Sequence, residues 1–244
     1  ESSRTALNQN GFILSMNKTK KPADRLIFHV DVNSAFLSWE SARRMKEGLP
    51  DLRDIPACIG GDPAKRTGIV VAKSIPAKKC GVQTGEPVAM ALRKCPNMVI
   101  VPSDFDLYVK CSRAFKKICA SYTPVMESFS IDEVFLDMTG TSLLYPDPIA
   151  AAHEIKDRIS DELGFTVNVG ISTNKLLAKM ASDFEKPNKV HTLFPEEIPA
   201  KMWPLPVREL LFLGKASEKK LTEAGIRTIG DLAHAWETDI QTLI

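Results

Sequence analysis

Three carboxylates in two short segments are the residues best suited to chemistry. Asp31 ends an apolar run at residues 26–31, and Asp132 and Glu133 are neighbours within residues 130–133. Carboxylates beside buried strands are costly unless they are neutralised, and ligands that are all oxygen favour Mg²⁺. Two such ions about 3.5–4 Å apart can activate an attacking hydroxyl and stabilise a leaving pyrophosphate.

The second segment must meet a geometric condition. Neighbouring side chains of a regular strand point to opposite faces, so Asp132 and Glu133 can share a site only where the chain turns or bulges. The alternative is that the three acids are strand-end carboxylates that face water or pair with lysines. The pattern alone leaves both interpretations open.

Basic residues form a second group of candidates. Lys186 follows a predicted helix in which Lys175 and Lys179 are one turn apart. Lysines that converge on a carboxylate–metal centre would suit a triphosphate, whereas a run of charges is more commonly a solvated face. Residues 61–81 also carry a local excess of positive charge. Their only acid is Asp62, and their basic residues are Lys65, Arg66, Lys73, Lys78 and Lys79.

The third candidate lies near the C-terminus, in residues 210–215 and 225–232. Two short helices joined by a tight turn can present backbone amides to DNA phosphates. An ordinary helical hairpin is the alternative, and this motif alone does not decide.

The elements that must position these residues form an α+β pattern. A strand at 26–31 leads into a helix that Ser34 could cap and that extends to about Met45. Residues 51–101 are rich in Gly and Pro and predict a small, irregular subdomain. Helices separated by Gly214, Gly225 and Gly230 follow residue 204. The region between alternates in a ferredoxin-like order, with helices at 104–122, 149–163 (Ile149 on its apolar side) and 174–184, and strands at 126–138, 166–171 and 190–194.

Composition excludes several classes of protein. Hydrophobic residues make up 44% and charged residues 25%, which are ordinary globular values. The net charge of +2 is too small to name a partner, and no apolar stretch is long enough to span a membrane. The five cysteines include no C-x-x-C pair, which argues against a zinc finger or a disulfide framework and favours a reducing cytosol. Residues 1–23 are interpreted as a disordered leader, with Met16 near a natural start.

The order and spacing of these motifs resemble those of the Y-family, translesion DNA polymerases, in particular their bacterial DNA polymerase IV branch. The resemblance covers about residues 24–244. Four segments carry it, namely His29-Val30-Asp31-Val32-Asn33-Ser34-Ala35-Phe36, Ser130-Ile131-Asp132-Glu133, Lys186-Pro187-Asn188 and the hairpin-like segment at 210–215 and 225–232. It implies a template-directed, error-prone DNA polymerase that adds dNTPs to a primer 3′-hydroxyl.

The resemblance also implies residue roles. Asp31, Asp132 and Glu133, with the Val32 carbonyl, would bind two Mg²⁺ ions, for which Mn²⁺ is a substitute. Phe36 would be the steric gate under the sugar of the nucleotide. The triphosphate would be held by Lys186 and by the backbone amides of Asn33, Ser34, Ala35 and Phe36.

Two departures from the family pattern bear on binding. Ile75 and Lys78 stand where family members carry a Tyr and an Arg that clasp the triphosphate, and lysine lacks the bidentate fork of arginine. Lys73 is the candidate to compensate. The expected Gly-x-Gly turn, which would hold DNA phosphates, reads Phe212-Leu213-Gly214 here, so Leu213, Gly214 and Lys215 are the expected DNA contacts.

The implied domains are a palm (24–35 and 102–193), fingers (36–101) and an incomplete helical thumb (194–244) with a helix-hairpin-helix-like element. The family's little finger is expected to be absent. The implied partners are primer–template DNA, a dNTP and a sliding clamp bound through regions outside this chain, with the protein a cytoplasmic monomer.

Two other functions remain open. A nucleotide cyclase can use a similar palm, but it would not need the thumb and would prefer ribonucleotides. A non-catalytic DNA-binding relative would keep the fold. Ile75 and Phe212 favour that relative, whereas the three carboxylates argue against it.

Overall fold

The computed structural model describes residues 25–61 and 68–243. The leader interpreted at 1–23 lies outside these residues, as do Asp62, Lys65 and Arg66 of the basic segment. In the described part of the chain the five cysteines are free thiols. No helix among these residues is both long and apolar enough to cross a membrane.

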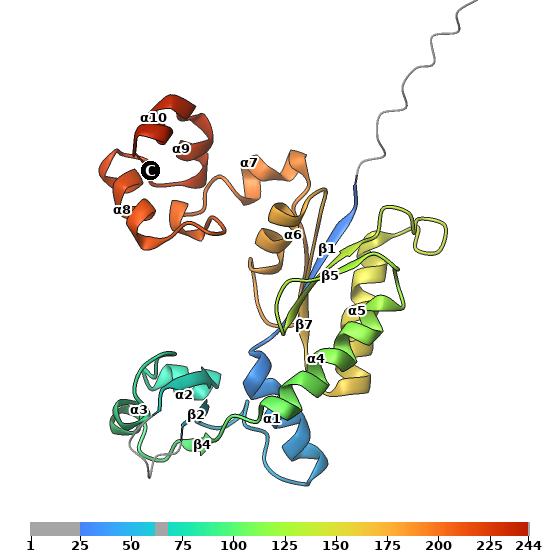
Figure 1. Ribbon diagram of the computed structural model, residues 1–244, viewed down its shortest axis with the longest axis vertical. Coiled ribbons are helices and arrows are strands. Elements are labelled where there is room, and N and C mark those ends of the chain that lie inside the picture. The colour runs from blue at the N-terminus through green and yellow to red at the C-terminus, as the bar shows by residue number, and fades with distance from the viewer. Residues whose placement is uncertain (1–24, 62–67, 244) are drawn as a thin grey trace, which may run out of the picture.

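A five-stranded sheet forms the centre of the molecule (Figure 1). Its middle strand β1 is antiparallel to both neighbours, and β7 pairs in parallel with β8. Strands β5, β6, β1 and β7 follow the split β-α-β-β-α-β arrangement. The predicted ferredoxin-like α+β fold is therefore confirmed. The order is β5 (Met126–Ser128), β6 (Glu133–Asp137), β1 (Ile27–Val32), β7 (Val167–Ser172) and β8 (Val190–Thr192).

The segment 126–138, predicted as one strand, is two strands joined by a turn. The amides of Phe129 and Ser130 both donate to the Glu133 carbonyl, at 3.1 and 3.2 Å, and reverse the chain. Asp132 therefore lies in the turn and Glu133 begins β6. The chain therefore turns at Asp132 and Glu133, as it must if the two side chains are to share a site.

Helices cover both faces of this sheet. In Figure 1, α4 (Phe105–Ala120) and α5 (Pro148–Leu163) lie on one side and α6 (Lys175–Ser182) on the other. The Asp147 carboxylate caps the start of α5, and Gly164 ends it at a φ of 80°. Ile149 was expected on the apolar side, but it is 45% exposed. The other residues expected on that side, Ala152, Ile155 and Ile159, are buried, together with Ala151 and Lys156.

Gly170 of β7 allows α6 to pack unusually close to the sheet. A Cβ at this position would lie 1.9 Å from the Ala178 carbonyl oxygen and 2.5 Å from the Ser182 nitrogen. Both atoms belong to the backbone and cannot rotate away. Only glycine therefore permits the spacing that places the polar side chains of α6 over β1.

A smaller unit is inserted between α1 (Ala35–Lys46) and α4. It has more regular structure than its Gly and Pro content predicts, because a three-stranded sheet in the order β3-β2-β4 runs through it. A separate cluster that includes Val70, Ala77 and Val88 forms its core. Its elements are β2 (Ala57–Gly60), β3 (Val70–Lys73), α2 (Ile75–Lys79), α3 (Val88–Lys94) and β4 (Val99–Val101).

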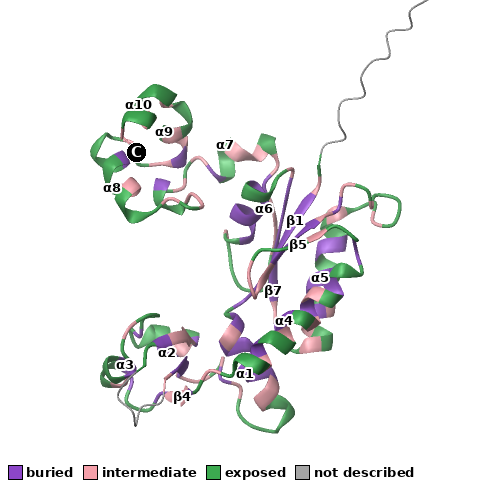
Figure 2. Cartoon of the chain, in the orientation of Figure 1, coloured by how far each residue is buried: buried purple, intermediate pink, exposed green. Residues whose placement is uncertain are grey.

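The C-terminal unit is helical and mostly exposed (Figure 2). Gly214 and Gly225 separate its helices as expected, but Gly230 lies inside α9. A Cβ on Gly230 would be 3.0 Å from the Trp203 Cβ, so close packing explains this glycine. A short 3₁₀ helix at Val207–Glu209 precedes the turn that leads to Gly214. The elements are η2 (Pro195–Glu197), α7 (Ile198–Lys201), η3 (Val207–Glu209), α8 (Lys215–Glu223), α9 (Ile229–His234) and α10 (Glu237–Leu243).

Candidate active site

The central strands place two carboxylates opposite each other. Asp31 of β1 pairs directly with Glu133 of β6 and, on its other side, with Asn168 of β7. Directly paired residues of antiparallel strands project from the same face. Asp31 is only 6% exposed, so the two acids form a largely buried pair at one end of β1.

Asp132 is near this pair in the backbone, but its carboxylate is engaged elsewhere. Its carbonyl accepts a hydrogen bond from the Val32 amide at 3.0 Å. Its Oδ1 accepts one from Ser130 Oγ at 2.5 Å, and Lys116 holds the turn through the Ser130 carbonyl at 2.6 Å. Within residues 25–61 and 68–243, no three His, Cys, Asp or Glu side chains are grouped so that they could hold a metal ion. The structure therefore brings two of the three predicted carboxylates together.

The Glu133 carboxylate contacts the ammonium group of Lys179 and the imidazole ring of His29. Its Oε2 accepts from Lys179 Nζ at 2.9 Å and lies 3.2 Å from His29 Nε2. Burial acts to raise the pKa of Glu133, but the hydrogen bonds from His29 and Lys179 outweigh it and lower that pKa to about 2. The carboxylate is therefore ionised over the whole neutral range.

Asp31 is paired with the predicted triphosphate lysine. Lys186 Nζ lies 2.6 Å from Asp31 Oδ2 and 2.7 Å from Asp183 Oδ1. Burial raises the pKa of Asp31, and attraction to Lys186 opposes that rise only in part. Burial acts to lower the pKa of Lys186, but the two carboxylates raise it overall. Lys186 is thus a firmly protonated cation.

The sequence indicated Lys179 as a candidate, but it did not single out His29 or Ser182 as site residues. His29 is completely buried, with Nδ1 2.8 Å from Ser182 Oγ, and Ser182 Oγ donates to the Lys179 carbonyl at 2.7 Å. His29 precedes Asp31 by two residues, so the strand period places both on one face. The two-residue spacing could have identified His29 as a site residue. The packing of α6 against this face could not be predicted, because no local sequence pattern encodes it.

Asn33 has a different position from the one predicted for nucleotide contact. It is buried, and its backbone amide donates to the Thr166 carbonyl at 3.0 Å. Its Oδ1 accepts from the Asn188 amide at 2.9 Å, and its Nδ2 donates to Asn168 Oδ1 at 3.1 Å. Asn33 therefore anchors the loop that carries Lys186.

Among the residues that the structure describes, none accepts a hydrogen bond from the first amides of α1, which are therefore available to an anion. Ser34 occupies the N-cap position, but with a φ of 47° its side chain makes no capping bond, so the expected cap is wrong. The first-turn amides of Ala35 and Phe36 have no acceptor within the helix. These donors point out of the helix N-terminus, where anions are favoured.

Phe36 is half-buried and belongs to an aromatic cluster. Its ring stacks on Tyr108 at a centroid distance of 4.6 Å, and the rings of Trp39 and Phe105 lie at 5.8 and 6.3 Å. One part of the ring therefore supports the core and the rest is accessible. The ring can therefore serve as the expected gate, and it also supports the hydrophobic core.

The predicted contacts in the inserted unit lie apart from the carboxylate pair. Lys73 ends β3 and donates to Thr84 Oγ1 at 3.0 Å, while Ile75 and Lys78 are on α2. Ile75 is 60% exposed. Among the described residues, no hydrogen bond or ion pair joins Lys73 or Lys78 to Asp31 or Glu133.

The predicted DNA contacts surround a strained turn. Gly214 is the N-cap of α8, Lys215 is the first residue of that helix, and Leu213 donates to the Leu210 carbonyl at 3.0 Å. Phe212 has a φ of 67° and is 80% exposed, and its ring lies 6.4 Å from that of Phe129. A bulky residue at this φ is costly, because the left-handed region suits glycine.

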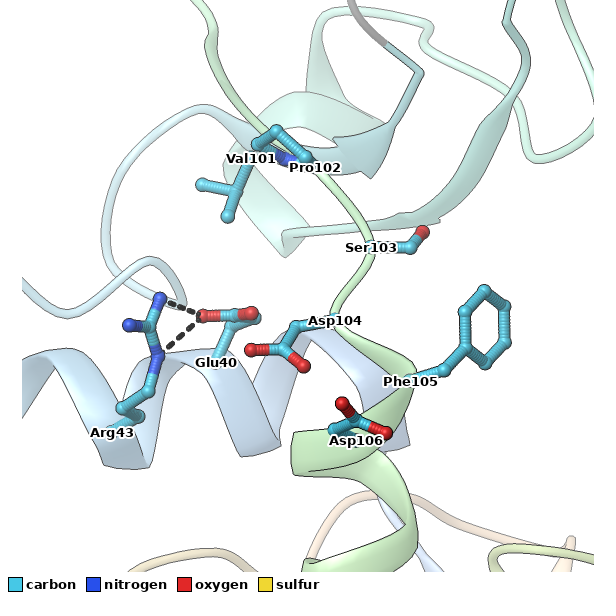
Figure 3. A pocket seen from close by; sticks show the side chains of 8 residues that line it. All are labelled: Glu40, Arg43, Val101, Pro102, Ser103, Asp104, Phe105 and Asp106. Carbon is cyan, nitrogen blue, oxygen red and sulfur yellow. Dashed lines mark hydrogen bonds and ion pairs between the residues drawn. The ribbon is translucent and has the colours of Figure 1, made fainter.

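A pocket of about 570 Å³ lies between α1 and the start of α4 (Figure 3). Glu40 points into it and is bonded by Arg43, whereas Phe105 turns away. None of the predicted site residues lines this pocket. It is therefore separate from the carboxylate pair.

The comparisons with known proteins agree with this geometry. DNA polymerase IV of Clostridium acetobutylicum is 52% identical over 210 residues, which cover 86% of this chain and 53% of that protein. DNA polymerase IV 1 of Bacillus subtilis is 41% identical, covering 90% and 52%. The crystal structure of DinB from Sulfolobus solfataricus matches with a TM-score of 0.78 at 25% identity, covering 89% of this chain and 62% of that one.

Together with the sheet order and the paired carboxylates, these matches define the fold as that of Y-family polymerase palm and fingers domains. The model of the impB/mucB/samB family matches residues 30–183. The chain belongs to this family, and its curated relatives are DNA polymerase IV proteins. It spans about half the length of those relatives.

Membership of this family implies dependence on a divalent metal. The donor set fits a hard cation, since Asp31 and Glu133 are opposite each other and the Val32 carbonyl follows directly on β1. In this structure Lys186 neutralises Asp31 and Lys179 neutralises Glu133. Asp132 would have to give up its hydrogen bond with Ser130 to bind the same ion. Two of the three predicted carboxylates thus fit in the present arrangement.

Proposed function

We propose that this chain is the catalytic part of a template-directed DNA polymerase of the error-prone, lesion-bypass type. The observation that carries the proposal is the directly opposed pair of Asp31 and Glu133, with Lys186 bonded to Asp31. Two Mg²⁺ ions, or Mn²⁺ in their place, would supply charge neutralisation and activate the primer 3′-hydroxyl.

The residues of the chain bind and orient the reactants. Asp31, Glu133 and Asp132, with the Val32 carbonyl, hold the ions, and Lys186 binds the triphosphate. The free amides at the start of α1 receive phosphate oxygens, with Asn33 acting through the loop that carries Lys186. Phe36 lies under the sugar and excludes a 2′-hydroxyl.

The remaining units bind the other partners. The palm is assigned to 24–35 and 102–193, the fingers to 36–101 and the thumb to 194–244. In the fingers, Lys73 and Lys78 approach the triphosphate, and Ile75 weakens that contact. Leu213, Gly214 and Lys215 of the thumb contact primer–template DNA. The protein acts as a cytoplasmic monomer, and a sliding clamp binds through regions outside this chain.

Ile75 and Phe212 remain the two residues that fit a non-catalytic relative, whereas the comparisons favour neither that alternative nor a cyclase. A non-catalytic relative has no need to keep a buried pair of carboxylates, whose burial is costly.

Single-turnover primer extension tests the proposal. The chain and primer–template are both used in excess of their dissociation constant, so that weak DNA binding does not limit the rate. We expect Mg²⁺-dependent addition of the templated dNTP, and we expect Asp31→Asn to abolish it. Bound DNA without extension would contradict the proposal, and a cyclic nucleotide product from ATP would identify a cyclase instead.

A further inference from the structure

The ammonium group of Lys186 is shared by two carboxylates of different exposure. Nζ lies 2.6 Å from Asp31 Oδ2 and 2.7 Å from Asp183 Oδ1. The Asp31 side chain is 9% exposed, whereas that of Asp183 is 48% exposed. Lys186 therefore joins the buried carboxylate to one at the surface.

Lys179 and Lys186 differ in their freedom to move. The Lys179 side chain is 10% exposed and is held by Glu133, with its ammonium 5.8 Å from the centre of the Phe129 ring. The Lys186 side chain is 36% exposed and follows α6 in a loop whose backbone Asn33 anchors at Asn188. Lys179 is thus a fixed counter-ion, whereas Lys186 can leave Asp31 by rotating its side chain alone.

The Lys186 ammonium group occupies a lone pair of Asp31 Oδ2, so it competes with a metal ion for this carboxylate. Both need the lone pairs of a buried carboxylate, and a second positive charge within a few ångströms adds repulsion. An anion that attracts Lys186 would remove this obstacle.

We propose that Lys186 controls metal binding at Asp31. Its ammonium group competes with a divalent cation for the carboxylate, and a nucleoside triphosphate relieves the competition by drawing the ammonium away. Metal and triphosphate then bind cooperatively, each strengthening the other by the same factor. Only the triphosphate step rests on the proposed function; the competition rests on the Lys186–Asp31 ion pair.

Binding of Mn²⁺ to the 244-residue chain, followed by the electron paramagnetic resonance of free Mn²⁺, tests the competition without catalysis. In the absence of nucleotide, we expect Lys186→Met to bind Mn²⁺ at least tenfold more tightly than the wild type, or about 1.4 kcal/mol. Lys189→Met is the matched control, because this neighbouring lysine pairs with Glu185 and not with Asp31. Equal affinities of Lys186→Met and Lys189→Met would overturn the proposal.

Two further measurements place the effect. Adding Asp31→Asn to Lys186→Met should remove the gain, and a gain that persists would show that Lys186 acts elsewhere. A non-hydrolysable dNTP should tighten Mn²⁺ binding by the wild type more than by Lys186→Met, and equal tightening would refute the triphosphate step. Lys186→Gln replaces Lys186→Met if circular dichroism shows that the latter is unfolded. Failure of primer extension would leave the Mn²⁺ comparison unaffected.

Discussion

Lys179 Nζ lies 2.9 Å from Glu133 Oε2, and both side chains are mostly shielded from water. The ion pair is reinforced by His29, which Ser182 fixes from its other side. A carboxylate held in this way keeps its charge and its orientation. It also makes the stability of the fold depend on pH.

We predict that Glu133 contributes stability that is lost in acid. Its pKa of about 2 in the folded protein is below the ordinary value of about 4.3. The contribution is therefore complete above about pH 4.5 and disappears as the pH falls towards 2. Between pH 5 and pH 3, the wild type should lose about 1.5 kcal/mol more than Glu133→Gln in urea unfolding. Parallel pH profiles for the two proteins would refute this.

Asp132→Asn should leave stability almost unchanged. The Asp132 carboxylate bonds to Ser130 Oγ and is not grouped with the other acids, so no repulsion is relieved and asparagine keeps the acceptor. We expect a change in the free energy of unfolding below about 0.5 kcal/mol, while primer extension falls by several orders of magnitude. Near-normal extension at saturating Mg²⁺ would remove Asp132 from the site.

Phe36→Ala should raise the use of rNTPs relative to dNTPs. Relief of overpacking worth about 1–3 kcal/mol corresponds to roughly 5- to 150-fold. Loss of the stacking on Tyr108 should also lower the melting temperature, so the incorporation ratio is the decisive measurement. Phe105→Ala, which removes a neighbouring ring, should not change that ratio. An unchanged ratio for Phe36→Ala would make Phe36 a core residue only.

Gly170→Ala should destabilise the fold severely. The added methyl would meet the backbone of Ala178 at 1.9 Å, so α6 must move away from the sheet. We expect a loss of more than about 3 kcal/mol in chemical unfolding. Gly140→Ala is the control, since a Cβ there meets nothing within 4 Å. Equal losses in the two variants would show that α6 packs less closely than described.

Phe212→Gly should strengthen DNA binding. Glycine is unstrained at a φ of 67° and allows phosphate to approach the backbone. One additional phosphate contact would steepen the dependence of log affinity on log salt by about 0.9, which fluorescence anisotropy with labelled primer–template can measure. Phe212→Ala also removes the ring but keeps the strain, so it should gain less. Equal gains would assign the effect to the ring alone.

The sequence predicted the elements whose signals are local. The apolar run before Asp31, the alternation from Val167 to Ile171 and the Gly-separated C-terminal helices all have such signals. The capture of Asp132 by Ser130 and the packing of Ser182 against His29 could not be predicted, because they depend on tertiary register. Gly230 was misplaced because its reason is contact with Trp203, not chain reversal.

The position of β1 in the middle of the sheet has a consequence for synthesis. His29 reaches Glu133 across 104 residues, and Asp31 reaches Lys186 across 155. At about 5–20 residues per second on the ribosome, β1 is made roughly 5–20 s before Glu133. During that time a strand of six residues, all buried in the finished fold, has neither partner strand. A chaperone that covers residues 27–32 would therefore protect nascent chains of this protein, and high-level expression should favour aggregation through that segment.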